Sequence, residues 1–332
     1  MALSGDARMG LVYDGSDVNL TSRARVTFTL SGETDHGLAF GGSFRADNAS
    51  GAAAGSAGNV FIEGAFGKLS FGDVDGAALA ATGDLHGVGL TGLGDTNEMT
   101  YISRVTNGLD AFVTSQTNDL FEDEDDVTVT GITTGLSSFP RALYTYSIDG
   151  FSVYASVAVS NSSSIGFAGT ITEEVDDTDV DVPFSGSVAV DSSLVEAAIG
   201  ASYEIDGFMV AAGYEQARLK VDGESETFGH GTLALGYSIE GVEIKAIYGR
   251  AMNDLRGVFA SNDQYGVSVS GSFDAVTVTA FGREDFARTQ YLGLGASYDL
   301  GGGAALRGGV VNTNPRGASS NTTADFGLAF TF

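Results

Sequence analysis

Four arginines near the start of the chain could act together through their charge. In extended strands, alternate side chains point to opposite faces, and this alternation places all four on one polar face formed by three consecutive segments. Guanidinium groups stay ionised, so the chemistry they offer is a fixed positive field rather than bond making. Unpaired in a dry core they would cost several kcal/mol, whereas water tolerates them. Asp6 and Asp47 share the face and could pair with some of them, and an ordinary solvated strand face is the alternative. The four are Arg8, Arg23, Arg25 and Arg45.

Residues suited to bond-making chemistry are few. The chain has no cysteine, and its three histidines, His36, His86 and His230, do not have the spacing of a metal site. No serine has the context of a nucleophile elbow, and no helix follows the glycines at 301–303. The sequence therefore predicts no enzyme and no required cofactor. A net charge of −27 also excludes general nucleic-acid binding, which needs a basic surface.

Two dense acidic runs lie in the middle of the chain, at 121–126 and 173–179. They can be read as solvated loop tips. They can also be read as sites for a hard divalent cation such as Ca²⁺, or for cations associated with lipopolysaccharide, because such cations prefer clustered carboxylates. The candidates for a calcium site are Glu122, Asp123, Glu124, Asp125 and Asp126.

Short segments that alternate apolar and polar residues must position these charges. In the segment 19–30, for example, Leu20, Val26 and Phe28 fall on one face and Thr21, Arg23, Arg25 and Thr27 on the other. Sixteen such segments predict sixteen strands. They cover residues 2–13, 19–32, 37–48, 58–66, 68–74, 139–148, 151–160, 194–205, 208–217, 227–239, 242–251, 263–273, 276–283, 289–300, 304–312 and 322–332.

The connections between these strands tend to alternate between short and long. Asp-Gly or Glu-Gly turns at 149–150, 206–207 and 240–241 are strong hairpin signals, whereas the connections at 74–138 and 161–192 are long and polar. This alternation is typical of an all-β, antiparallel up-and-down barrel, and a sandwich would not sort its loops this way. No run approaches the roughly 18 apolar residues of a membrane helix, so a membrane protein of this sequence would cross with strands.

Tyrosines support the membrane interpretation. They stand on the apolar face just before short turns, where an aromatic girdle at the membrane interface would lie. The alternative is that tyrosine is simply common in strands. The residues are Tyr146, Tyr203, Tyr237 and Tyr298.

Several segments together resemble a known family. They are Leu3 to Tyr13, Ser22 to Val26, Phe40 to Arg45, Ala65 to Lys68, Gly83 to Gly89, Leu294 to Gly303 and the terminal Phe332. The chain resembles a general diffusion porin of Gram-negative bacteria, most closely the Rhodobacter type. The likeness covers both ends and is weak from about residue 100 to 290.

The resemblance implies one barrel domain over residues 1–332, with sixteen transmembrane strands and a homotrimeric assembly. It also implies that the third loop, within 74–138, folds into the lumen, its first part constricting the pore. Acidic side chains of that loop would then face Arg8, Arg23, Arg25 and Arg45, which we call the arginine wall. The two sets of charges would create a transverse field. These acids are Asp84, Asp95, Glu98 and Asp110, and the alternative is an extracellular flap with ordinary acids. Strand alternation also points four further cations toward the lumen, but they are scattered along the chain. They are Arg141, Lys245, Arg283 and Arg307.

We therefore expect a passive outer-membrane channel for small hydrophilic solutes and ions, embedded in lipid and lipopolysaccharide and without nucleic-acid partners. An exported barrel needs a leader, so we interpret Met1-Ala2 as an expression start that replaces a removed signal peptide, and a cytosolic protein is the alternative. One alternative is a substrate-selective or ion-selective porin on the same barrel. Another is a secreted Gly/Asp-rich β-adhesin, which predicts a short nonapeptide repeat that the sequence does not show.

Overall fold

A computed structural model describes residues 1–47, 58–105, 127–133, 140–175, 178–221 and 223–332. In these residues the chain forms one antiparallel sheet with two short helices. The first strands are β1 (Ala2–Tyr13), β2 (Val18–Glu33), β3 (Ala39–Asp47), β4 (Gly58–Gly64) and β5 (Gly67–Gly72). The helices α1 (Ala77–Thr82) and α2 (Ile102–Val105) and the strand β6 (Val127–Thr133) follow. The remaining strands are β7 (Arg141–Ile148), β8 (Phe151–Val175), β9 (Thr178–Ile205), β10 (Phe208–Val221), β11 (Glu224–Ile239), β12 (Val242–Asn253), β13 (Asp263–Phe273), β14 (Val276–Glu284), β15 (Gln290–Gly301), β16 (Ala304–Asn314) and β17 (Asn321–Thr331).

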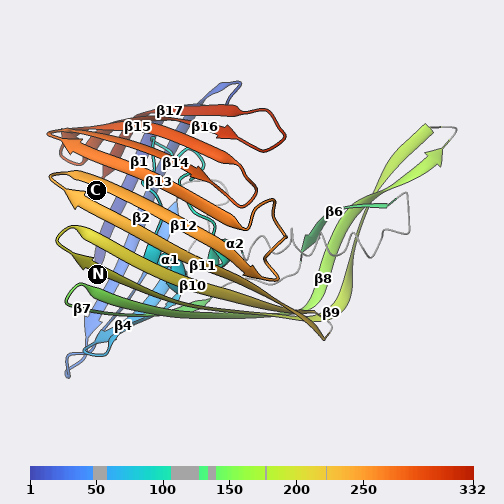
Figure 1. The fold of residues 1–332 in the computed structure, drawn as a ribbon, viewed down its shortest axis with the longest axis horizontal. Coiled ribbons are helices and arrows are strands. Elements are labelled where there is room, and N and C mark those ends of the chain that lie inside the picture. Colours follow the sequence, from blue (N-terminus) through green and yellow to red (C-terminus); the bar gives the residue numbers. More distant parts are fainter. Residues whose placement is uncertain (48–57, 106–126, 134–139, 176–177, 222) are drawn as a thin grey trace.

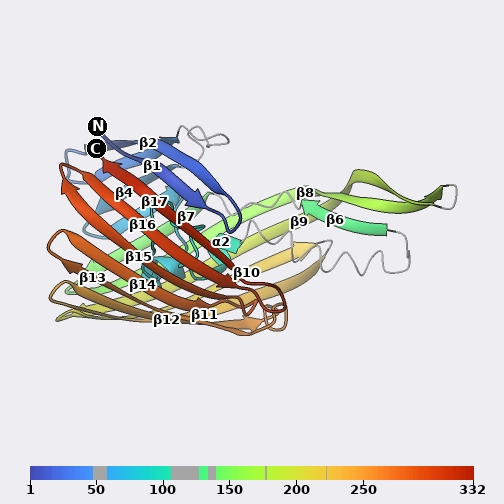
Figure 2. The same ribbon diagram turned by 90° about the horizontal axis from the view of Figure 1, so that it is seen from above.

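Sixteen of these strands close into a barrel. Each pairs with its neighbours in the chain, β5 pairs directly with β7, and β17 returns to β1 with Leu11 opposite Phe326. β6 lies outside this ring and pairs with β8. The predicted sixteen-stranded up-and-down barrel is therefore confirmed, and closure leaves no open sheet edge in the ring. Figures 1 and 2 show the tilted strands around the barrel and both termini at the same end.

The outer surface of the barrel is apolar. Leu20, Ile199 and Leu292 are 89%, 63% and 64% exposed, which a soluble protein would avoid for large side chains repeated around a sheet. The same strands turn their polar residues inward, the arrangement of a barrel in lipid around a wet interior. Tyr203 and Tyr298 stand on this outer face, as expected of a girdle. Neither helix in the described ranges is long and apolar enough to cross a membrane.

The tight turns follow the sequence prediction. Asp149-Gly150, Asp206-Gly207 and Glu240-Gly241 all have positive φ at both positions. This is the backbone that two-residue hairpins need to match the twist of the strands.

Two predicted connections contain strands, since β6 lies within 74–138, and the connection at 161–192 is the larger error. The connection expected at 161–192 is largely strand, because β8 continues to Val175 and β9 begins at Thr178. The two strands form a long hairpin that projects beyond the barrel, with β6 beside it (Figures 1 and 2). Outside a bilayer a strand needs no apolar face toward lipid, so the polar composition that indicated a loop does not prevent pairing here.

Candidate functional site: the lumen and its inserted loop

The loop after β5 enters the lumen through the short helix α1. Its sequence, Ala-Ala-Leu-Ala-Ala-Thr, has high helix propensity, and the helix ends at Gly83 with φ +61°. The first amide of the helix, that of Ala77, donates to the Ser156 hydroxyl of β8 at 2.8 Å. A side chain of the barrel wall thus satisfies a donor that the start of a helix leaves open.

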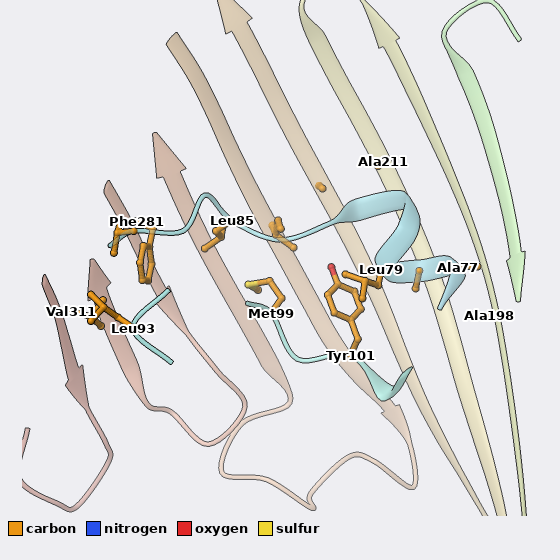
Figure 3. Packing of buried hydrophobic residues seen from close by; sticks show 14 residues of the cluster. Ala77, Leu79, Leu85, Leu93, Met99, Tyr101, Ala198, Ala211, Phe281 and Val311 are labelled. Carbon is orange, nitrogen blue, oxygen red and sulfur yellow. The ribbon is translucent and has the colours of Figure 1, made fainter. Parts of the chain in front are cut away.

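The hydrophobic core of the protein lies between this loop and the inner face of the barrel (Figure 3). Two wall glycines allow the close approach. A Cβ at Gly200 would lie 2.5 Å from the Ala77 carbonyl oxygen, and one at Gly213 would lie 2.7 Å from the Ala78 Cα. The loop contributes Ala77, Ala78, Leu79, Leu85, Val88, Leu93, Met99 and Tyr101, and the wall contributes Ala198, Ala211, Ala234, Ile247, Phe281 and Val311.

One buried arginine fastens both ends of the described part of the loop. Arg141 of β7 donates to the Val74 carbonyl at 2.6 Å, where the loop begins, and to the Ser103 carbonyl at 3.0 Å, where it returns. The same guanidinium binds both carboxylate oxygens of Glu196 on β9 at 3.0 Å. The Arg141 and Glu196 side chains are 2% and 1% exposed, so this charge pair is an internal clamp and not part of the open pore surface.

The returning segment of the loop is bound by a second buried group of wall residues. Glu215 of β10 accepts the Ile102 amide at 2.6 Å and contacts His230 Nδ1 at 2.7 Å. Gln264 of β13 exchanges two hydrogen bonds with the Thr100 backbone, at 2.9 Å and 2.6 Å. Buried polar groups that are fully paired fix a single arrangement, so these contacts hold the loop at one position in the lumen.

The tip of the loop is attached to the opposite side of the barrel. Asp325 of β17 accepts the amides of Leu90 and Thr91 at 2.8 Å and 2.6 Å, and the Thr91 hydroxyl at 2.7 Å. The chain then reverses over 92–95, where four successive residues, Leu93 and Asp95 among them, have positive φ. This reversal leaves the Asp95 side chain exposed.

The arginine wall exists as a contiguous group on β1, β2 and β3. Arg8 and Arg23 are direct cross-strand neighbours. Arg23 pairs with Asp6 at 2.9 Å, and Arg25 and Arg45 share Asp47 at 3.0 Å and 2.8 Å.

Four cations and two anions leave this wall with an excess of two positive charges. Among the described residues, Arg8 has no carboxylate within ion-pair distance. It donates to the Thr91 carbonyl at 3.4 Å, so the wall meets the loop at its tip.

Two of the loop acids contact Arg104, a cation that the sequence analysis did not identify. Arg104 of α2 binds Asp84 through both terminal nitrogens, at 2.8 Å and 2.6 Å, and lies 3.3 Å from Glu98. Removal from water raises the pKa of Glu98, against the opposing effect of Arg104, and the charges of Asp84 and Asp95 raise it further. Desolvation likewise raises the pKa of Asp75, which precedes α1. The acids therefore form one group whose charge depends on protonation.

The predicted site residues fall into three sets. The four arginines lie together, as expected from their parity. Glu98 and the exposed Asp95 belong to the acidic group of the loop, whereas Asp84 is held by Arg104. Asp110 and the run Glu122, Asp123, Glu124, Asp125 and Asp126 lie outside the described residues. In the part of the chain that the structure describes, no group of three or more His, Cys, Asp or Glu is arranged to hold a metal ion.

Lowering the pH should make the lumen less favourable to cations, relative to anions, before ordinary carboxylates titrate. Because the pKa values of Glu98 and Asp75 are raised, both bind protons at a higher pH than ordinary carboxylates do, and the loop loses negative charge. Reversal potentials in a salt gradient, taken from about pH 7 to about pH 4.5, measure the change. The double substitution Glu98→Gln and Asp75→Asn should remove the early part of the titration. An unchanged titration in that variant would contradict the assignment.

Comparison with known proteins agrees with this architecture. A model of the Gram-negative porin family matches residues 1–318. A porin of Rhodobacter capsulatus is 36% identical over 352 residues, covering 99% of each chain.

Solved structures give the same result. A porin structure refined at 1.8 Å resolution is similar with a TM-score of 0.67 and 32% identity, over 100% of this chain and 99% of that one. A mutant of Rh. blastica porin shares the fold at a TM-score of 0.57 and 20% identity, over 100% and 99% of the two chains. The chain therefore belongs to the Gram-negative porin family and is an outer-membrane channel protein rather than an enzyme.

Proposed function

We propose that this porin lets small hydrophilic solutes and ions diffuse passively across the outer membrane, through a lumen limited by a transverse electric field. The positive side of the field is the wall of Arg8, Arg23, Arg25 and Arg45, and the negative side is the acidic group of the loop, with Asp95 and Glu98. The observation that supports this proposal is the excess of two positive charges on β1 to β3, in a barrel whose inserted loop presents carboxylates.

Such a field would discriminate by polarity as well as by size. A polar solute can align its dipole between the two walls, whereas an apolar solute must displace the water that the charges order. No binding step or bond making is required, because a channel needs only a hydrated passage, a limiting diameter and a field.

We also propose a homotrimer in contact with outer-membrane lipid and lipopolysaccharide. The outward face of β1 to β4 carries small residues, which allow two barrel walls to approach closely. These include Gly5, Ala7, Ala24, Gly42, Ala46 and Gly64.

Reconstitution in a planar bilayer tests the function. We expect conductance steps that come in threes and that rise in proportion to salt concentration without saturating. A protein that inserts without conducting would overturn the channel assignment, and single steps would overturn the trimer alone.

A further inference from the structure

From a pocket beneath the loop we infer that the lumen holds a weak binding site for small zwitterions, namely amino acids with a neutral side chain. The pocket lies at the short-turn end of the barrel, next to the turns that join β9 to β10 and β11 to β12. Its volume is about 540 Å³, within the range of pockets that take small ligands. The inference rests on the proposed function, since the ligand must first enter the lumen.

Lys245 of β12 supplies the positive group of the site. Its ammonium lies at the end of α1, where a Cβ at Gly83 would be 2.7 Å from Lys245 Nζ. Among the described residues, none is within hydrogen-bond or ion-pair distance of this ammonium. Asp84 acts on it from further away, but Arg104 already binds that carboxylate. A partly buried cation with three donors and no acceptor can bind a carboxylate of a ligand.

Glu243 supplies an oriented negative group. The Ser268 hydroxyl accepts the His86 amide at 3.0 Å and lies 2.8 Å from His86 Nδ1. If that hydroxyl donates to Nδ1, the proton of the neutral ring sits on Nε2, which donates to Glu243 at 3.1 Å. One carboxylate oxygen of Glu243 is thereby fixed, and its side chain, which lines the pocket, stays 59% exposed to solvent.

The balance of charge in the pocket selects a zwitterion over a simple ion. Besides Lys245 the pocket is lined by the carboxylates of Glu204, Asp206 and Glu243, so a plain anion is repelled. A plain cation leaves the Lys245 ammonium without an acceptor. A ligand with both charges can place its carboxylate at Lys245 and its ammonium at Glu243 or Glu204. Met209 and Gly236 add a surface that a small side chain can contact.

Flux of L-alanine into proteoliposomes tests the site. Free diffusion gives a flux proportional to concentration, whereas a site in the path gives saturation. We expect wild-type protein to saturate with alanine but not with ethylammonium, which lacks the carboxylate, or with propionate, which lacks the ammonium. A linear flux of alanine through channels that conduct salt would overturn the site and leave the proposed function standing. Channels that conduct nothing would instead defeat the proposed function.

Two substitutions test whether the saturation of the alanine flux arises at this pocket. Lys245→Met removes the cation and should raise the half-saturating concentration at least about tenfold, the loss expected for one charge-assisted hydrogen bond. Glu243→Gln alters an exposed side chain, so it tests the site without disturbing the core. The matched control is Arg307→Met on β16, which removes an exposed inward cation that also stands four residues after a hairpin turn and does not line the pocket. Equal half-saturation in wild type, Lys245→Met and Glu243→Gln would overturn the proposal.

Discussion

Replacing Glu196 with glutamine should destabilise the barrel and loosen the constricting loop at the same time. The substitution keeps the shape of the side chain but leaves the Arg141 guanidinium buried without its carboxylate. Breaking a buried charge pair in this way costs about 3–5 kcal/mol. Because Arg141 also binds the carbonyls of Val74 and Ser103, both ends of the described loop depend on its position.

Two measurements separate the effects. Thermal unfolding in detergent should show a lower midpoint for Glu196→Gln, and single-channel recordings should show a larger or noisier conductance. Glu33→Gln is the matched control, since it makes the same change at an exposed position on the inner face of β2 and does not line the pocket described above. A midpoint equal to that of wild type would show that the pair does not hold the loop.

The barrel itself was predictable because the signals for its strands and turns lie within short stretches of sequence. Two-residue periodicity and the Asp-Gly turns defined strands such as 242–251 and 276–283 to within about two residues of the structure. The failure at 161–192 has the same origin. Alternation reports contact with lipid, so strands that continue beyond the membrane no longer carry the signal.

The contacts that attach the loop to the wall could not be predicted from the sequence. A charged side chain that points into the barrel can either line the open pore or be buried under the loop. Arg45 and Arg141 both point inward, yet one is half-exposed beside water and the other is buried under the loop. Nothing in the sequence around Asp325 shows that it binds amides 234 and 235 residues earlier in the chain. Only the position of the loop decides whether an inward charge lines the pore or fastens the loop.

Replacing Arg8, Arg23, Arg25 and Arg45 together with alanine should convert the positive wall into a negative one. Asp6 and Asp47 would remain without their cations, so the local balance would change from an excess of two positive charges to two negative ones. At about 4 Å in a water-like medium one unit charge acts on another with about 1 kcal/mol, and about 1.4 kcal/mol corresponds to a tenfold ratio. We therefore expect the cation-to-anion permeability ratio to rise up to about tenfold at low salt, with a larger conductance from the widened aperture.

The charge and the size of the arginines can be distinguished by a second variant. Replacing the same four residues with lysine keeps the positive charges but loses the planar contacts with Asp6 and Asp47. Reversal potentials in a salt gradient should then stay near the wild-type value for lysine and shift for alanine, and the shift should shrink as salt screens the field. If alanine leaves both the reversal potential and the conductance unchanged, these arginines do not border the limiting part of the lumen. The field must then arise from other charges, since the wall would be too far from the path of the ions to act on them.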